Sequence, residues 1–493
     1  MGKDEMKIIL DSVHGYIHIE RAYITNIVDT PYFQRLRRVE QTSTRAVFPS
    51  ARHDRFIHSL GVYHLGYKIV EHLAKSLGET AQTKPIFESY KLACLLHDVA
   101  HTPFSHTFEK FFDNQWSDLR GDLKALEKEA QFDIDWDNTT DPSAPHERLS
   151  AIVALGVFGD FITYRGASKE LVARMIIGLK YSDNTLYSLE NSMIELIHGD
   201  VIDADGLDYA CRDTWAAGYS TTSIDVDRLI DSINIVEDEG IYKLCFTAKC
   251  LNEIESVLHV KTFQQYYVIN HHTVAYEQRL LVKSVESAAQ FHFYGHVNDN
   301  QDEREAALAK LCNVKAFYDV RNPGLVGIET DSTHIKISLP KDDDFVSLMS
   351  YIPNDKYVKQ WFSRQYELKP LWKTKADFYD HFDQLREVRL LKGSWIFSND
   401  CLKFISDRFG IQRENIWRVR ATAKYKGNFA EKVSIYVHDH VVPYDKLLPK
   451  DIQSYEPPKN EYYYIFVPVQ ADISSIIAAL KEEYVKFFML RAE

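Results

Sequence analysis

The sequence predicts a mainly α protein, in which a helical bundle with small β elements is followed by a C-terminal α+β lobe. Three observations support this. Residues 1–20 alternate as short extended pieces, residues 21–290 carry apolar residues at helical spacing, and strand-like runs appear beyond about residue 325. A chain of 493 residues is long enough for two such units. We therefore predict a core over residues 1–325 and a lobe over residues 326–493.

The core is expected to begin with strands and to continue as helices. Ile17 and Ile19 alternate with polar neighbours, as in a half-buried strand. The following stripes repeat apolar residues every three or four positions, a spacing typical of core-facing helices. They lie at residues 62–73, 90–99, 171–179, 193–197 and 258–267.

Two later segments complete the predicted organisation. An acidic, weakly apolar insertion lies between residues 113 and 145, and we interpret it as a flexible lid or a subunit contact. In the lobe, helical segments are expected between residues 343 and 372 and a final helix over residues 472–490. Alternating runs predict strands at residues 333–339, 416–425, 433–437 and 462–469.

Composition excludes several classes of protein. Lys plus Arg total 58 and Asp plus Glu total 71, a net charge of −13, so a nucleic-acid partner is not expected. The six cysteines form no C-x-x-C pair, which argues against a zinc ribbon and a disulfide scaffold. The start Met1-Gly2-Lys3 is no signal peptide, and no apolar stretch has the length of a membrane span. We expect a cytoplasmic protein without a membrane partner.

The most informative stretch is the pair His97–Asp98, an imidazole beside a carboxylate that together can chelate one divalent ion. The helical spacing of residues 90–99 predicts that His97 and His101 share a helix face. A buried histidine bonded to its neighbouring carboxylate is the structural alternative. His58, near the start of an apolar helical run, and Asp205, among several carboxylates, offer further ligand atoms.

His58, His97–Asp98 and Asp205 reproduce the H…HD…D pattern of HD-domain phosphohydrolases, and the chain is similar to the SAM-and-HD-domain deoxynucleotide triphosphohydrolases and their bacterial dGTPase-like relatives. The resemblance implies that residues 1–325 are an HD-domain helical bundle, the catalytic core, with an N-terminal regulatory segment. A SAM domain is not expected, because the first motif already lies at the amino terminus. The motifs that carry the resemblance are residues 11–15, 29–37, 48–49, 55–62 and 97–106.

The resemblance implies a catalytic centre built on one divalent metal. His58, His97, Asp98 and Asp205 are then its ligands, and imidazoles with carboxylates suit Mn, Fe, Mg or Zn. Water attacks the α-phosphorus of a deoxynucleoside triphosphate, which releases the deoxynucleoside and intact triphosphate. An imidazole that titrates near neutrality suits the proton donor for the leaving 5′ oxygen.

Three further histidines match the active-site histidines of the family, namely His101, His106 and His146. The resemblance leaves His106 or His146 as the acid, and Glu147 or Glu109 as the carboxylate that orients a ring. For His146 the alternative is an ordinary position in the first turn of a helix, since Pro145 and Glu147 are typical of a helix start.

Substrate contacts are implied by the same resemblance. Gln41 matches a sugar contact, Arg55 a phosphate contact, and Tyr209 and Asp213 contacts to phosphate and the 3′-hydroxyl; His272 and Tyr276 match an H-x-x-x-Y pocket. Two cations of the family are replaced, one by Gly206 and one by Val268. Binding of the distal phosphates then requires a substitute, for which we consider Arg45, Lys261, Arg279 and a second metal.

A regulatory site is implied at the residues that match Asp29, Gln34 and Arg37. In the family these positions bind an activating nucleotide between subunits, so we expect a nucleotide activator and a homo-oligomer, either dimer or tetramer. The alternative is a surface helix whose arginines are solvated charges.

Three functions follow for testing. The leading one is a metal-dependent deoxynucleoside triphosphate triphosphohydrolase, regulated by an allosteric nucleotide, with antiviral depletion of dNTPs as one role. The second is a phosphomonoesterase or phosphodiesterase acting on another nucleotide, which the two replaced cations favour. The third is a catalytically weak nucleotide sensor.

Overall fold

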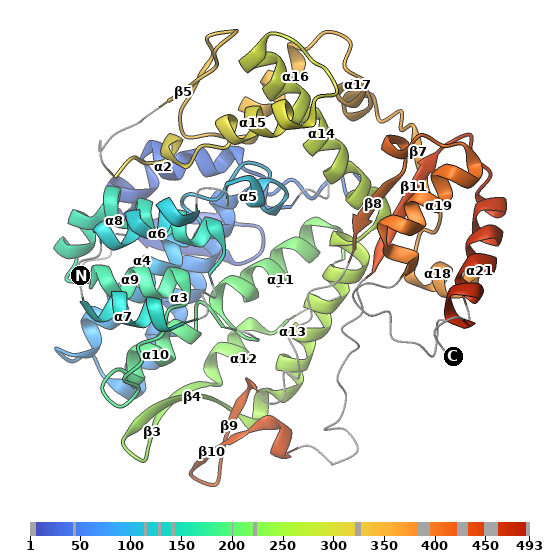
Figure 1. The fold of residues 1–493 in the computed structure, drawn as a ribbon. Helices are drawn as coiled ribbons and strands as arrows, with labels where there is room; N and C mark the ends of the chain where they lie inside the picture. Colours follow the sequence, from blue (N-terminus) through green and yellow to red (C-terminus); the bar gives the residue numbers. More distant parts are fainter. Residues whose placement is uncertain are drawn as a thin grey trace.

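A computed structural model describes residues 6–489, apart from residues 43–45, 113–115, 127–129, 140–142, 200, 220–223, 321–326, 383–394, 422–431 and 448–461. It is mainly α, as predicted, with helices gathered in a bundle and a smaller α+β part at the opposite side (Figure 1). Among the described residues, no helix has the length and apolarity needed to span a membrane.

The chain begins with the hairpin β1 (Met6–Asp11) and β2 (Gly15–Glu20), which confirms the extended pieces expected there. The two strands are antiparallel, with Met6 opposite Glu20. Gly15 has φ +72°, a left-handed conformation that a residue without a Cβ adopts at little cost. Four short helical turns follow, which are α1 (Arg21–Tyr23), a π-helical turn (Ile24–Val28), α2 (Pro31–Gln34) and the 3₁₀ helix η3 (Arg35–Arg38).

The bundle contains helices at each of the stripes predicted by apolar periodicity, together with further helices that no stripe predicted. They are α3 (Arg55–Leu77), α4 (Thr83–Leu96), α5 (His106–Phe112), α6 (Trp116–Leu126), α7 (Ala130–Asn138), α8 (Pro145–Tyr164), α9 (Lys169–Ile177), α10 (Ser188–Glu195), α11 (Ala204–Ala216), α12 (Val226–Asp231), α13 (Leu251–Phe263), α14 (His272–Tyr294) and α15 (Gln301–Leu311). A single large cluster of buried apolar side chains joins them.

The predicted helix over residues 90–99 is too long by three residues. Helix α4 ends at Leu96, and His97 is its C-cap residue. The chain then turns away, and Pro103 cannot continue a helix. His97 and His101 therefore do not share a helix face, and the structure corrects that expectation.

The acidic insertion between residues 113 and 145 contains helices α6 and α7. Phe132 and Trp136 of α7 are buried, and Asp135 forms an ion pair of 2.9 Å with the buried Arg174 of α9. Apolar anchors of this kind attach α7 to the bundle. The role of the insertion as a lid or a subunit contact stays a prediction.

Strands β3 (Ile233–Asp238) and β4 (Ile241–Thr247) interrupt the region for which helices were expected. Their tight turn places Glu239 and Gly240 at φ +56° and +79°, the signature of a hairpin turn. Strand β9 (Ser434–Val437) adds to β4 in parallel and pairs with β10 (His440–Pro443), which gives the sheet order β10-β9-β4-β3. A late segment of the chain thus returns to the bundle (Figure 1).

The rest of the C-terminal part is α+β, as predicted. A three-stranded antiparallel sheet has the order β7-β11-β8 and is covered by helices. Only two short strands form near the run predicted at residues 333–339. The elements are β5 (Ile328–Glu329), β6 (Lys336–Ile337), α16 (Asp342–Ser350), α17 (Lys356–Ser363), β7 (Leu368–Pro370), α18 (Lys375–His381), α19 (Asn399–Phe409), β8 (Trp417–Arg420), β11 (Tyr463–Pro468) and α21 (Ile473–Met489).

A second hydrophobic cluster forms around this sheet and includes Trp372 and Phe378, together with Tyr276 and Leu280 of α14. Helix α14 extends from the bundle to this sheet (Figure 1). Phe345 of α16, in contrast, belongs to the large cluster of the bundle. The division at residue 326 stays a prediction, and the C-terminal part contributes to both clusters.

Candidate metal centre and catalytic histidines

Three elements bring the predicted metal ligands together. His58 lies in the first turn of α3, whose start is capped by the Asp54 carboxylate accepting the Ile57 N–H at 2.9 Å. His97 caps the end of α4 and Asp98 follows it. Asp205 lies in the first turn of α11. All four predicted ligands therefore lie at or next to the end of a helix. Their spacing in the sequence did not show this arrangement.

The ligand atoms converge on one point. His58 Nε2 lies 3.0 Å from Asp205 Oδ1 and 3.3 Å from His97 Nε2. Asp98 Oδ2 lies 3.6 Å from each of these two imidazole nitrogens. Nitrogen and oxygen donors at such separations fit the coordination shell of a single divalent ion.

The hydrogen bonds of the two imidazoles test this fit. His58 Nδ1 lies 2.7 Å from Asp208 Oδ2, and His97 Nδ1 lies 3.0 Å from the carbonyl oxygen of Cys94. Because both partners are acceptors, each ring carries a proton on Nδ1, which leaves both Nε2 atoms available for a metal ion. Two Nε2 lone pairs at this distance would repel, so a cation belongs between them, either a metal ion or the proton that His58 takes up when no metal is bound. In metal-binding histidines, the ring nitrogen that does not bind the metal typically donates its N–H to a carboxylate or a carbonyl oxygen, as both rings do here.

The electrostatics favour positive charge at the same point. Burial lowers the pKa of His58, but Asp205 and Asp208 outweigh it and raise the pKa to about 10. Burial opposes ionisation of Asp98, yet Arg55 and the neighbouring histidines keep its pKa well below the usual range. These carboxylates are therefore ionised, and the donor set fits a divalent metal.

Asp208 is a further candidate residue of this site that the sequence reasoning missed. Besides contacting His58, its carboxylate contacts His14 Nε2 at 2.6 Å and Arg212 at 2.8 Å. Arg212 also pairs with Asp11 at 2.9 Å. The sequence signal was the motif at residues 11–15, in which His14 contacts Asp208 and Asp11 contacts Arg212, the partner of Asp208.

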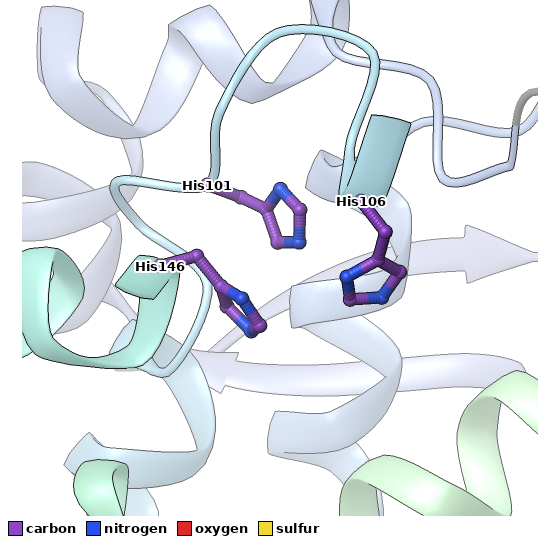
Figure 2. Close-up of side chains that lie close together, drawn as sticks. All are labelled: His101, His106 and His146. Carbon is purple, nitrogen blue, oxygen red and sulfur yellow. The ribbon is translucent and has the colours of Figure 1, made fainter. Parts of the chain in front are cut away.

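The three predicted catalytic histidines lie together (Figure 2), with their ring nitrogens close to one another. The ring of His101 is 4.2 Å from that of His146 and 5.2 Å from that of His106, measured between centroids. His146 Nε2 lies 3.9 Å from Asp98 Oδ1, which connects the two groups of residues. The predicted histidines thus form one site with the predicted metal ligands.

One carboxylate orients two of these rings. Glu109 accepts from His106 Nδ1 at 2.9 Å and from His146 Nδ1 at 2.6 Å. Burial lowers the pKa of His146, but Glu109 outweighs that effect and raises it. Burial and the charge of Arg55 keep the pKa of His101 well below its ordinary value, so His101 is neutral.

Glu147 does not have the role expected for it. Its carboxylate accepts the Ala144 N–H at 2.6 Å and lies 3.7 Å from His198, so it stabilises the start of α8. Glu109 is the carboxylate that contacts the rings, and we remove Glu147 from the candidate catalytic set.

Several predicted substrate residues border this centre. Arg55 donates to Asp98 Oδ2 at 2.6 Å and to Ser105 Oγ at 3.0 Å. Gln41 is buried, and among the described residues its Oε1 has no hydrogen-bond partner. Asp213 lies 2.7 Å from His53 Nε2. Arg55 therefore contacts a metal ligand directly, and Gln41 offers an unused acceptor.

Lys261 lies beside Gly206, the position at which the family resemblance implies a cation that this chain lacks. A Cβ at residue 206 would collide with Lys261 Nζ and lie 3.1 Å from its Cε, so Lys261 fills the space that this glycine leaves. The ammonium donates to the Val201 carbonyl at 2.9 Å and lies 5.2 Å from the centroid of Tyr209. A cation thus stands next to Asp205 and Tyr209. Arg45 lies outside the described residues, and Arg279 lines a separate hollow of about 640 Å³.

His272 and Tyr276 are not joined to the metal centre. Tyr276 is only 2% exposed, its hydroxyl donates to Gln360 Oε1 at 2.9 Å, and its ring stacks on Trp417 at 5.2 Å. The His272 ring lies 6.2 Å from that of Tyr464. Both belong to the C-terminal hydrophobic cluster or its edge, and the substrate contact expected of Tyr276 gains no support.

Two of the three predicted regulatory residues contact each other. Arg37 Nε donates to Gln34 Oε1 at 3.0 Å, and the Arg37 guanidinium stacks 3.5 Å from the Phe56 ring centroid. Asp29 is exposed at the end of the π-helical turn. The binding of a nucleotide here stays a prediction.

The chain is similar in sequence to known proteins. Residues 55–207 match the model of the HD domain, a span that includes the four predicted metal ligands and the three predicted catalytic histidines. The chain is 28% identical over 295 residues to the uncharacterized protein YwfO of Bacillus subtilis, covering 59% of this chain and 58% of that protein. It is 27% identical over 288 residues to the Dictyostelium discoideum homolog of deoxynucleoside triphosphate triphosphohydrolase SAMHD1, covering 58% of this chain and 50% of the relative.

Solved structures share the fold. A phosphohydrolase from Bacteroides thetaiotaomicron superposes with a TM-score of 0.59 at 19% identity, over 94% of this chain and 99% of that one. The chain spans about half the length of the curated relatives named above. The match of residues 55–207 to the HD domain and the shared fold confirm the predicted HD-domain helical bundle, and the chain is similar, over 58% of its length, to a protein named as a homolog of deoxynucleoside triphosphate triphosphohydrolase SAMHD1.

Proposed function

We propose that the protein is a metal-dependent deoxynucleoside triphosphate triphosphohydrolase. The single observation that supports this best is the convergence of His58, His97, Asp98 and Asp205 beside a cluster of three histidines. Metal ligands and proton-transfer groups at one site are what hydrolysis at phosphorus requires. Relatives named as enzymes of this activity support the choice of substrate.

The four ligands would hold one divalent ion, whose positive charge and Lewis acidity would act on the α-phosphate when it is bound. Asp208 and the Cys94 carbonyl keep the two ligand imidazoles in the required tautomer. His101 is neutral, so it can accept or donate a hydrogen bond at this site without adding positive charge. Each group has a defined task before substrate arrives.

The leaving 5′ oxygen takes its proton from His106 or His146. Both rings hold Nδ1 on Glu109, so in each the Nε2 atom faces away from that carboxylate. Glu109 stabilises whichever ring becomes positively charged. Separate His106→Gln and His146→Gln variants identify the donor, since loss of the acid removes the basic limb of the pH profile for kcat.

Lys261 supplies part of the charge that holds the distal phosphates. Its ammonium lies beside Asp205 and Tyr209, where a triphosphate attached to the metal site would extend. Arg55, which donates to Asp98, supplies the phosphate contact that the family resemblance implies. Lys261 stands in for the cation that Gly206 replaces.

Purified protein, incubated with Mn²⁺ or Mg²⁺, each dNTP and each candidate activator nucleotide, tests the proposal. We expect one triphosphate for each deoxynucleoside released. The Asp98→Ala and His97→Ala variants should lose both metal binding and turnover. Orthophosphate as the product would instead favour a phosphomonoesterase, and nucleotide binding without any turnover would favour a sensor.

A further inference from the structure

The loop that carries two of the three candidate catalytic histidines, His101 and His106, adopts a strained conformation. We call residues 97–106 the histidine loop. Two consecutive residues in it, Phe104 and Ser105, have φ +53° and +50°. Residues with a Cβ avoid this region, and they remain there only when the surrounding structure holds them. His101 lies before this strained pair and His106 directly after it.

A side chain from far along the chain holds the strained pair. Asp342, the first residue of α16, accepts the Phe104 N–H at 2.6 Å through Oδ1. Its Oδ2 accepts the Glu40 N–H at 2.9 Å. Glu40 in turn accepts from Ser105 Oγ at 2.6 Å. The Asp342 carboxylate therefore links the histidine loop, through Phe104, to Glu40, which directly precedes the candidate substrate contact Gln41.

Burial makes this arrangement costly. Asp342 is only 7% exposed, and burial raises its pKa to about 7. A buried carboxylate rarely improves stability compared with an apolar side chain. The two backbone hydrogen bonds, and not the packing of α16, therefore explain why an acidic residue stands here.

Two further contacts fix the loop. At its other end, the buried Arg35 of η3 donates to the carbonyl of His101, and its guanidinium lies 4.7 Å from the Phe317 centroid. Behind it, the Phe345 ring of α16 packs 5.5 Å from that of Phe108. Burial lowers the pKa of Arg35 to about 9, although the carboxylate of Asp342 opposes this effect.

We propose that Asp342 is a positioning residue, which sets the histidine loop so that its His101 and His106 lie against His146 beside the predicted metal site, while Arg35 holds the opposite end. This inference rests on the proposed function. It assigns α16, which follows the predicted boundary at residue 326, to the catalytic machinery of the bundle. Asp342 touches no reacting atom and acts through the backbone of Phe104.

Three variants of the full chain test this role. Asp342→Ala removes both acceptors, and Asp342→Asn keeps the shape and one acceptor. Asp343→Asn is the matched control, because Asp343 is the next residue of α16 and forms an exposed ion pair with Arg38 at 2.8 Å. For each variant we would measure kcat and KM for dNTP, bound Mn²⁺, and the ¹⁵N imidazole signals of histidine.

We expect kcat of Asp342→Ala to fall by about 100-fold, the loss typical of a catalytic group displaced by about 1 Å. Asp342→Asn should lie between this value and wild type. KM and bound Mn²⁺ should change much less, and the signals of His101 and His106 should shift. Asp343→Asn should match wild type in every measurement.

Unchanged histidine signals in Asp342→Ala, or a wild-type kcat per folded molecule with only a lower melting temperature, would overturn the positioning role. If the wild-type protein hydrolyses no dNTP, the proposed function fails. The imidazole signals then still decide whether Asp342 sets the histidine loop.

Discussion

Replacing Lys261 tests how the active site holds the triphosphate. Lys261→Met removes an ammonium that lies beside Asp205 and Tyr209 and keeps most of the side-chain volume. A hydrogen bond to a charged group contributes about 1.5–3 kcal/mol, which corresponds to an increase in KM of about 10- to 150-fold. Steady-state kinetics with dNTP and Mn²⁺ would measure this, with Lys310→Met as the control because Lys310 pairs with Asp331 at the surface.

The double variant Gly206→Lys with Lys261→Met sharpens the test. It moves the cation from α13 to α11; loss of Lys261 Nζ removes the nearest contact of a Cβ at residue 206, and the Asp203 carboxylate, 2.6 Å from that Cβ, has to shift to admit the new side chain. Lysine also favours a helix over glycine by up to about 1 kcal/mol. We expect the KM of the double variant to return most of the way from the raised value of Lys261→Met to the wild-type value. An unchanged KM in Lys261→Met, or a double variant no better than the single one, would refute this reasoning.

Two further predictions concern groups that contact the histidines of the candidate site, and a third concerns an ion-pair network elsewhere on α4. Asp208→Asn should weaken Mn²⁺ binding by about 10- to 100-fold, since it disturbs the tautomer of His58, and a titration that gives wild-type affinity would contradict this. Glu109→Gln should lower kcat but leave Mn²⁺ binding unchanged, whereas a kcat equal to wild type would remove Glu109 from the mechanism. Burial raises the pKa of Glu88, but Lys91 and Arg165 outweigh it and lower the pKa below the ordinary 4.5, so its ion pairs stabilise the fold above that pH and are lost as the pH falls through the folded pKa. Urea unfolding from pH 7 to pH 3 should therefore show a steeper loss of stability in wild type than in Glu88→Gln, and equal slopes would speak against this contribution.

The four predicted metal ligands come together in the structure, and part of the information that pointed to them is local. His97 and Asp98 are adjacent, and His58 lies near the start of a helix that periodicity located, whereas Asp205 was one of several neighbouring carboxylates. Such short patterns can be recognised in the sequence without knowledge of tertiary contacts. The end of α4 was predicted less well, because the turn at residues 97–105 depends on contacts with distant residues such as Asp342.

The residues that support the site could not be predicted in the same way. Phe104 and Asp342 are separated by 238 positions, and no periodicity relates them. Lys261 was one of several candidate cations in the sequence. Only the structure shows that its side chain fills the space next to Gly206. The parallel pairing of β4 with β9 is equally non-local, so a helical expectation covered β3 and β4. Glu147 was misassigned because a helix start and an orienting carboxylate have the same sequence pattern.

The position of bond cleavage is the most direct test of the central claim. Hydrolysis of a dNTP in ¹⁸O-labelled water, with Mn²⁺ and the full chain, should place one ¹⁸O atom on the terminal phosphorus of triphosphate that was the α-phosphorus of the substrate. The released deoxynucleoside should carry no label. Label in orthophosphate, which indicates attack at the γ-phosphorus, or label in the deoxynucleoside, which indicates cleavage of the C–O bond, would contradict the account.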